Sequence, residues 1–180
     1  MQSLNEIYYG KELKVFIYNP EHQSSLRAAE LILSLDCVVC EDLVKADLAI
    51  APMLDKKLTP DEFNKPRLGT LIFHPSLLPR HRGPDAIKWA YKLNESYTGV
   101  TWFWCSEGFD EGDICEQEIV KLDLTIRPGE FYKNEIMPAM LKTLGRAIED
   151  LKRGVVRKVP QNHNAATYEK KLLKSELVNV

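Results

Sequence analysis

The 180-residue chain lacks the features that would place it with membrane proteins or nucleic-acid-binding proteins. No apolar run reaches the length that a bilayer demands, so we expect no membrane partner. The formal net charge is only -2, which leaves no overall field that would attract nucleic acid. The first residues lack the basic-then-apolar order of a secretion signal, and we therefore expect a cytoplasmic protein. Nothing in the composition indicates an oligomeric state.

Cysteine is scarce, with four residues, and its spacing does not favour a metal site. Cys37 and Cys40 are spaced as C-x-x-C, but the run CVVC is typical of a strand, in which residues three apart point to opposite faces. Cys105 and Cys115 supply no second pair at ligand spacing. We therefore expect ordinary reduced thiols and no metal cofactor.

Short β-rich runs alternate with helical runs, which predicts an α/β domain with a mostly parallel central sheet and helices on both faces. The length suits one domain and is too short for two ordinary ones. Strands are expected in the second half of 11–18 and at 37–40, 47–52, 68–74, 98–105 and 114–122. Helices are expected after Asn19-Pro20, after Thr59, at 84–93 and at 128–153 with an interruption at Pro138, and residues 155–180 should form an irregular tail.

One strand in this pattern ends on a histidine, in the segment LIFHPSLLPRHRG at 71–83. Leu71 to Phe73 are apolar without alternation, as expected for a central strand that is covered on both faces. Pro75 keeps His74 out of helical backbone, so the imidazole should project from a defined point at the strand end. This placement suits a catalytic side chain, although a lone histidine after a strand is more often structural.

A second candidate, Asp110, lies in the acidic loop SEGFDEG after the strand at 98–105. Carboxyl ends of parallel strands share one edge of a sheet, so His74 and Asp110 are predicted to meet there. A carboxylate beside an imidazole fixes the ring and can itself accept a proton, which suits acyl transfer. An aspartate in such a loop is commonly only a turn former, and Glu107, Glu111 and Asp113 compete for the acidic role.

The loop after His74 is basic, and two interpretations of its arginines stay open. Arg80 and Arg82 either hold an anionic group of a substrate or lie on a solvated loop. The remaining histidines are His22 near a helix start, His81 between the two arginines and His163 in the polar tail. None of these three histidines is assigned a catalytic role.

The motifs HPSLLPRHRG at 74–83 and GFDEGD at 108–113 resemble those of the folate-dependent formyltransferase superfamily. Similarity also covers AIKWA at 86–90 and ATYE at 166–169, and extends over roughly residues 45 to 170. The superfamily includes the glycinamide ribonucleotide and methionyl-tRNA formyltransferases. The motif wording is most similar to the hydrolase domain of 10-formyltetrahydrofolate dehydrogenase.

The resemblance implies a Rossmann-like domain that takes a formyl group from 10-formyltetrahydrofolate, without a metal. The group would pass through a tetrahedral intermediate to an amine of a small metabolite or amino sugar, or to water. His74 matches the family's catalytic histidine and Asp110 its catalytic aspartate. The folate pocket would be formed by Pro52, Met53 and Leu54 on one side and Ser106, Glu107, Gly108 and Phe109 on the other.

Two departures from the family pattern bear on function. Amine formyltransferases of the family carry asparagine two residues before the histidine, where this chain has Ile72, which cannot stabilise an oxyanion. The hydrolase domain of the dehydrogenase resembles this chain in carrying an apolar residue there, which favours hydrolysis or an acceptor that reacts without that donor. The region before His74 is also shorter than in typical members. The alternative hypothesis is a non-catalytic folate- or nucleotide-binding module of the same fold.

Overall fold

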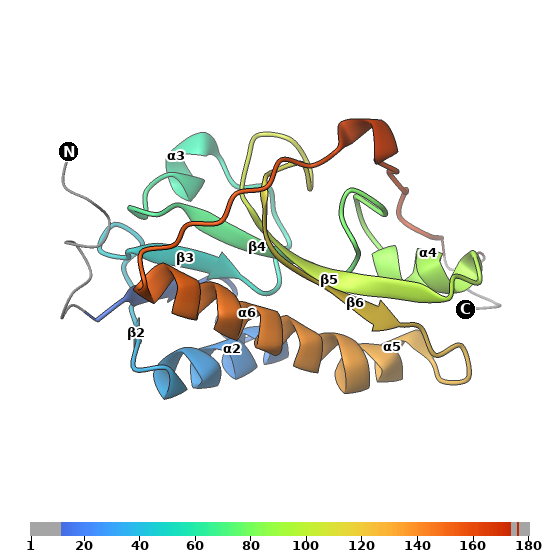
Figure 1. Ribbon diagram of the computed structural model, residues 1–180, viewed down its shortest axis with the longest axis horizontal. Helices are drawn as coiled ribbons and strands as arrows, with labels where there is room; N and C mark the ends of the chain where they lie inside the picture. The colour runs from blue at the N-terminus through green and yellow to red at the C-terminus, as the bar shows by residue number, and fades with distance from the viewer. Residues whose placement is uncertain (1–11, 174–175, 177–180) are drawn as a thin grey trace.

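The computed structural model describes residues 12–173 and residue 176 of the chain. Within these residues six strands form one mixed sheet in the order β2-β1-β3-β4-β5-β6 (Figure 1). The expectation that the chain begins without a secretion signal falls largely on residues outside those described. No helix among the described residues is long and apolar enough to cross a membrane.

The first half of the sheet is parallel. Its strands are β1 (Lys14–Ile17), β2 (Val38–Val39), β3 (Leu48–Ala51) and β4 (Thr70–His74), and β1–β2, β1–β3 and β3–β4 are all parallel pairs. All four residues of β3 are buried, because both faces of the central strands are covered. These strands confirm the expected α/β pattern.

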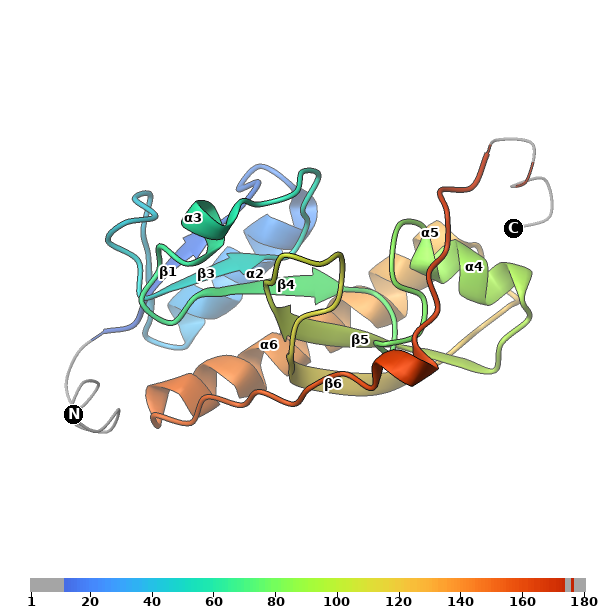
Figure 2. The same cartoon turned by 90° about the horizontal axis from the view of Figure 1, so that it is seen from above.

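The second half of the sheet is antiparallel. Strand β5 (Tyr97–Trp104) pairs antiparallel with β4, and β6 (Ile114–Lys121) pairs antiparallel with β5. We expected β4 and β5 to end at the same edge of the sheet. That expectation is wrong, because antiparallel strands end at opposite edges. The amide of Cys105, just after β5, donates to the carbonyl of Thr70 at the start of β4 over 2.7 Å. The loop at 105–113 must fold back over the sheet to approach His74, as Figure 2 shows.

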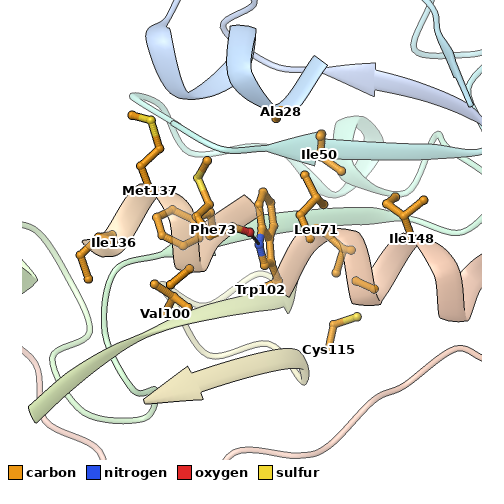
Figure 3. Close-up of a cluster of buried hydrophobic side chains, with 14 of the residues drawn as sticks. Ala28, Ile50, Leu71, Phe73, Val100, Trp102, Cys115, Ile136, Met137 and Ile148 are labelled. Carbon is orange, nitrogen blue, oxygen red and sulfur yellow. Dashed lines mark hydrogen bonds between the residues drawn. The ribbon is translucent and has the colours of Figure 1, made fainter. Parts of the chain in front are cut away.

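Two long helices cover one face of the sheet. They are α2 (Gln23–Ser34) and α6 (Met137–Lys152), which lie side by side in Figure 1. The main core lies between these helices and the sheet, where Phe73 of β4 packs against Trp102 of β5 with ring centroids 5.4 Å apart (Figure 3). The Trp102 indole N–H donates to the carbonyl of Met140 in α6 over 3.0 Å, which satisfies its polar atom inside the core.

The opposite face carries one short helix, α3 (Pro60–Phe63), and several loops. Thr59 begins α3 as predicted, because its hydroxyl accepts from the amide of Glu62 while the Glu62 carboxylate accepts from the Thr59 amide. Phe63 packs with Ala49 and Ala51 of β3 in a second, smaller core. Small alanine side chains on this face of β3 leave room for the loops above it.

The predicted long helix at 128–153 is interrupted just before Pro138, which has no backbone N–H to donate. It consists of α5 (Pro128–Phe131), a π-helical turn η1 (Tyr132–Ile136) and α6. The amide of Met137 donates to the carbonyl of Tyr132, five residues earlier, and so shifts the bonding pattern before the proline. The remaining helix, α4 (Ala86–Lys92), follows the loop after β4 and contacts α5 and β5.

The segment after α6 is irregular up to residue 173, apart from a short 3-10 turn η2 (His163–Ala165), and it is tightly attached to the domain. Val159 forms an antiparallel bridge with Ile114, and Tyr168 forms a parallel bridge with Arg82. The indole N–H of Trp89 in α4 donates to the carbonyl of Lys170 over 2.9 Å. The segment therefore joins β6, the loop after β4 and α4 (Figure 2).

Candidate functional site

A cavity of about 430 Å³ lies over the end of β4, on the face that bears α3. Its walls come from the loop after β3, from Ile72 and His74 of β4, from residues 83–86, and from the loop at 105–110. The volume falls in the range of small-molecule sites, which are concave and mostly apolar with a few polar groups. His74 and Asp110 are two of those polar groups.

His74 is 8% exposed, and one of its two ring nitrogens makes a hydrogen bond. Its Nε2 lies 2.6 Å from the backbone carbonyl of His81. Because a carbonyl only accepts, Nε2 must carry a proton and donate it, which leaves Nδ1 as the nitrogen available for proton exchange. Nδ1 lies 3.8 Å from Oδ2 of Asp110.

Asp110 reaches this position through left-handed backbone, with φ of 54°. Aspartate tolerates that conformation better than most residues, which fits its place at the tip of the loop. Its Oδ2 accepts a hydrogen bond from the amide of Gly83 over 2.7 Å. The loop after β4 and the loop after β5 thus meet at this carboxylate, and the structure brings together the two residues that the sequence singled out.

Two buried side chains, Arg82 and Gln161, hold the loop that carries Asp110. The sequence singled out Arg82 but not Gln161. The amide of Gln161 donates to the carbonyls of Asp110 and Gly112 over 2.9 and 2.7 Å. Its Oε1 accepts from Nη2 of Arg82 over 2.8 Å, and both side chains belong to residues only 5% exposed. Gln161 lies in the segment expected to be an irregular tail, and no motif there pointed to this contact.

The two arginines of the basic loop do not line the cavity. Arg82 is buried and contacts Gln161, Glu111 and His163. Its side chain is therefore not exposed to solvent. Arg80 points to the exterior with its side chain 52% exposed and pairs with Glu95. Neither guanidinium is placed to hold an anionic substrate group in the cavity.

Most of the residues expected to bind folate do line the cavity. Pro52, Met53 and Leu54 form one wall, and Ser106, Gly108 and Phe109 contribute to the opposite one. Glu107 is exposed and does not line the cavity. The hydroxyl of Ser106 is buried and has no hydrogen-bond partner among the described residues.

Several cavity residues were not expected from the sequence. Lys57 lies at the cavity with its ammonium 4.8 Å from the ring centroid of Phe109, a cation–π contact between the two walls. Tyr132, from the π-helical turn, also lines the cavity and shares a 2.8 Å hydrogen bond with Ser24. Tyr168, in the ATYE motif, lines it as well and is 62% exposed. The ATYE resemblance was the only available signal for Tyr168.

Ile72 lies two residues before His74 on β4, so its side chain faces the same side of the sheet. It lines the cavity and packs against the small core of Ala49, Ala51 and Phe63. The apolar side chain therefore occupies the cavity wall at the position where the family resemblance implies an oxyanion donor.

The titration of two other cavity side chains is shifted by their surroundings. Burial raises the pKa of the Cys105 thiol to about 11, although a hydrogen bond with Ser106 and the charge of Lys57 oppose the shift. Burial also raises the pKa of Tyr132, against the effect of its hydrogen bond with Ser24. Both groups are therefore neutral near pH 7.

Among the described residues, no group of three or more His, Cys, Asp or Glu side chains is arranged to hold a metal ion. All four cysteines are free thiols, and Cys37 and Cys115 are buried.

A family model described as formyl transferase matches residues 22–135 of the chain. The human mitochondrial 10-formyltetrahydrofolate dehydrogenase is 31% identical over 126 residues, which are 70% of this chain and 14% of that protein. A methionyl-tRNA formyltransferase of Lachnospira eligens is 35% identical over 130 residues, 72% of this chain and 41% of the relative. The chain thus spans well under half the length of these curated relatives.

Among solved structures, HypX from Aquifex aeolicus in complex with tetrahydrofolic acid superposes with a TM-score of 0.79. The two sequences are 26% identical, and the match covers 91% of this chain and 30% of HypX. The residues that the family model matches include His74 and Asp110. The chain belongs to the formyl transferase family.

Proposed function

We propose that this chain moves a formyl group from 10-formyltetrahydrofolate to a small amine or to water. The observation that carries the proposal is the His74–Asp110 pair, 3.8 Å apart at one end of a largely apolar cavity. Titratable groups that meet in such a cavity are the usual sign of proton-transfer chemistry. Family membership, through the model match to residues 22–135, supports the choice of formyl transfer.

The donor would bind between the two loop walls of the cavity. Pro52, Met53 and Leu54 supply apolar surface for a flat heterocycle, and Phe109 supplies an aromatic edge. The unsatisfied hydroxyl of Ser106 would gain a partner from a polar group of the ligand. The volume of about 430 Å³ is sufficient to enclose the heterocycle and the formyl group.

His74 would act on the formyl oxygen. Its Nε2 donates to the His81 carbonyl, so the ring would present a proton toward the cavity, at Nδ1, only when it carries both protons. When a nucleophile attacks the formyl carbon, negative charge develops on the oxygen, and a positioned donor lowers the barrier. His74 is buried and fixed by its strand, which suits it to this role.

Asp110 would act on the nucleophile. A bond forms between the acceptor nitrogen, or a water oxygen, and the formyl carbon, and the bond from that carbon to the folate nitrogen breaks. The proton that the nucleophile loses passes through the Asp110 carboxylate, directly or by a water, and ends on the departing folate nitrogen. The Gly83 amide orients the carboxylate for this exchange.

Neither arginine of the basic loop lines the cavity. Arg80 and Arg82 are engaged with Glu95 and Gln161 away from the cavity, and the cationic side chains that line it are Lys56 and Lys57 in the loop after β3. Ile72 offers no hydrogen bond to a developing oxyanion, which lowers the expected rate with poor nucleophiles. We therefore propose a small amine of a metabolite or amino sugar, or water, as the acceptor.

The experiment is to incubate the full chain with 10-formyltetrahydrofolate carrying a ¹³C-labelled formyl group, with and without a panel of amines. Mass spectrometry then shows whether the label appears in an N-formyl product, in formate, or stays on the donor. Formylated amine or formate well above the enzyme-free control is the expected result. Retention of all label on the donor, in a protein that binds it, would overturn the proposal.

That last outcome would instead support the alternative, a non-catalytic folate-binding module of the same fold. The observation that favours this alternative is Ile72, which fills the wall beside His74 with an apolar side chain. Calorimetric titration with a stable folate analogue separates a binding module, which releases heat on titration, from a chain that has lost the site.

A further inference from the structure

The side chain of His81 has no place in the chemistry described above, yet it is among the most buried polar groups of the chain. The residue is 2% exposed and takes left-handed backbone with φ of 55°. It lies in the loop between β4 and α4, with Arg80 and Arg82 on either side. A buried histidine needs partners for both ring nitrogens, and the structure provides one for each.

Both partners of the His81 ring are carboxylates. Nε2 lies 3.0 Å from Oε2 of Glu95, which follows α4. Nδ1 lies 3.1 Å from Oε1 of Glu169, in the segment after α6, without the angle of a hydrogen bond, so this contact is electrostatic. The two glutamate side chains are 17% and 12% exposed. The segment after α4 and the segment after α6 thus both contact the His81 ring.

The two carboxylates of this cluster differ in their other partners. Glu95 also pairs with Arg80, whereas the second carboxylate oxygen of Glu169 is buried without a hydrogen-bond partner among the described residues. A buried carboxylate in that situation is costly unless a cation lies beside it. The His81 ring is the group that both carboxylates contact.

The backbone of His81 connects this cluster to the reacting histidine. The His81 amide donates to the hydroxyl of Thr167 over 2.8 Å, and its carbonyl accepts from Nε2 of His74 over 2.6 Å. The contacts with Glu95 and Glu169 hold the ring, and the Arg82 amide, in the same peptide unit as the His81 carbonyl, donates to the Thr167 carbonyl over 3.0 Å. The carbonyl in turn decides which nitrogen of His74 carries the proton in the neutral ring.

We propose that His81, clamped between Glu95 and Glu169, is a positioning residue that holds His74 with Nδ1 toward Asp110. The inference rests on the proposed function, in which Nδ1 of His74 acts on the formyl oxygen. It also gives the segment after α6 a role in the reaction, because Thr167 and Glu169 both belong to it. A purely stabilising cluster would leave the tautomer of His74 unchanged when it is altered.

The test records the ring nitrogens of the histidines in the full chain by long-range ¹H–¹⁵N correlation NMR. The variants are His81→Phe, which removes both ring contacts, and Glu169→Gln, which keeps shape and removes one charge. Glu116→Gln is the matched control, since Glu116 is 6% exposed but pairs with Arg146 and Arg157 near β6, not with His81. If His81→Phe does not fold, the conservative Glu169→Gln variant still carries the test.

In the unaltered chain and in Glu116→Gln, the neutral His74 ring should be protonated at Nε2 alone. In His81→Phe and Glu169→Gln we expect a mixture of both tautomers, with kcat lower by about tenfold and KM for the donor nearly unchanged. An Nε2-protonated His74 with unaltered kcat in the folded variants would overturn the inference. The NMR result needs no turnover, so failure of the positioning role and failure of the proposed function are separable.

Discussion

The imidazole and the carboxylate at the cavity make no direct hydrogen bond to each other, whereas the carboxylates between β6 and α6 are paired directly with arginines. At the cavity, Nδ1 of His74 and Oδ2 of Asp110 are 3.8 Å apart, beyond hydrogen-bond length. Between β6 and α6, Arg146 lies 2.6 Å from both Glu116 and Glu118, and Arg157 bridges Glu116 and Asp150.

Under the proposed function, this difference separates a pair that takes part in the reaction from a cluster that stabilises the fold. In the β6–α6 cluster (Glu116, Glu118, Asp150, Arg146 and Arg157), guanidinium groups engage the carboxylates, and proton exchange would break those contacts. Hydrogen bonds from Arg146 and Lys142 hold the pKa of Glu118 below its usual range, although burial acts against them. At the cavity, Nδ1 of His74 stays free to exchange a proton with a ligand.

The largest expected effect is the loss of turnover on removing either member of the cavity pair. His74→Ala and Asp110→Ala should each lower kcat by about 10²- to 10⁴-fold, because each removes a positioned proton donor or acceptor. The measurement is formyl loss from the donor under saturating conditions, with binding of a folate analogue as the control for an intact cavity. Full turnover in both variants would show that the cavity pair is no more important for the reaction than the β6–α6 cluster.

A smaller gain is expected from restoring a donor in the cavity wall. Ile72→Asn places an amide beside the formyl oxygen, and a donor of this kind can contribute about 2.7 to 4 kcal/mol in an optimal site. Because this wall has packed around isoleucine, we expect only about a tenfold rise in transfer to amines. Rates with amine and with water are compared for Ile72→Asn and for Ile72→Val, which adds no polar group. An unchanged amine rate in the asparagine variant would contradict our account of Ile72.

The smallest effect on turnover is expected in the β6–α6 cluster. Glu116→Gln removes a buried partner of two arginines whose side chains are 40% and 45% exposed, so solvent compensates much of the loss. We expect the free energy of unfolding to fall by about 1 to 2 kcal/mol in urea titrations, with turnover unchanged. A large drop in kcat at full folding would mean that this cluster also serves the reaction.

The sequence predicted the local elements of the fold well, because their signals are local. Thr59 with Glu62 marked the start of α3, and Pro138 marked the interruption before α6. The apolar run before His74 identified β4. Strand direction was not encoded in such short patterns, so the antiparallel placement of β5 was missed, and with it the return of the acidic loop over the sheet.

The candidate site was predictable only where a motif was present. His74 and Asp110 stood out through their motifs, and the geometry brings them together although the reasoning about strand ends was wrong. Gln161 contacts Asp110, which is distant in sequence, and the polar segment around Gln161 gives no sign of this partner. Glu169 lies in the ATYE motif, but the motif did not indicate its contact with His81. The burial of Arg82 was missed for the same reason.

The most direct test of the central claim, that His74 and Asp110 work as one pair, is a double-mutant cycle on kcat. Single-turnover rates of formyl loss are measured for the unaltered chain, His74→Ala, Asp110→Ala and the double variant. Groups that act as a unit are strongly non-additive, so we predict that the double variant is no slower than the slower single variant. Losses that multiply across the two substitutions would contradict the pair and assign the residues independent roles.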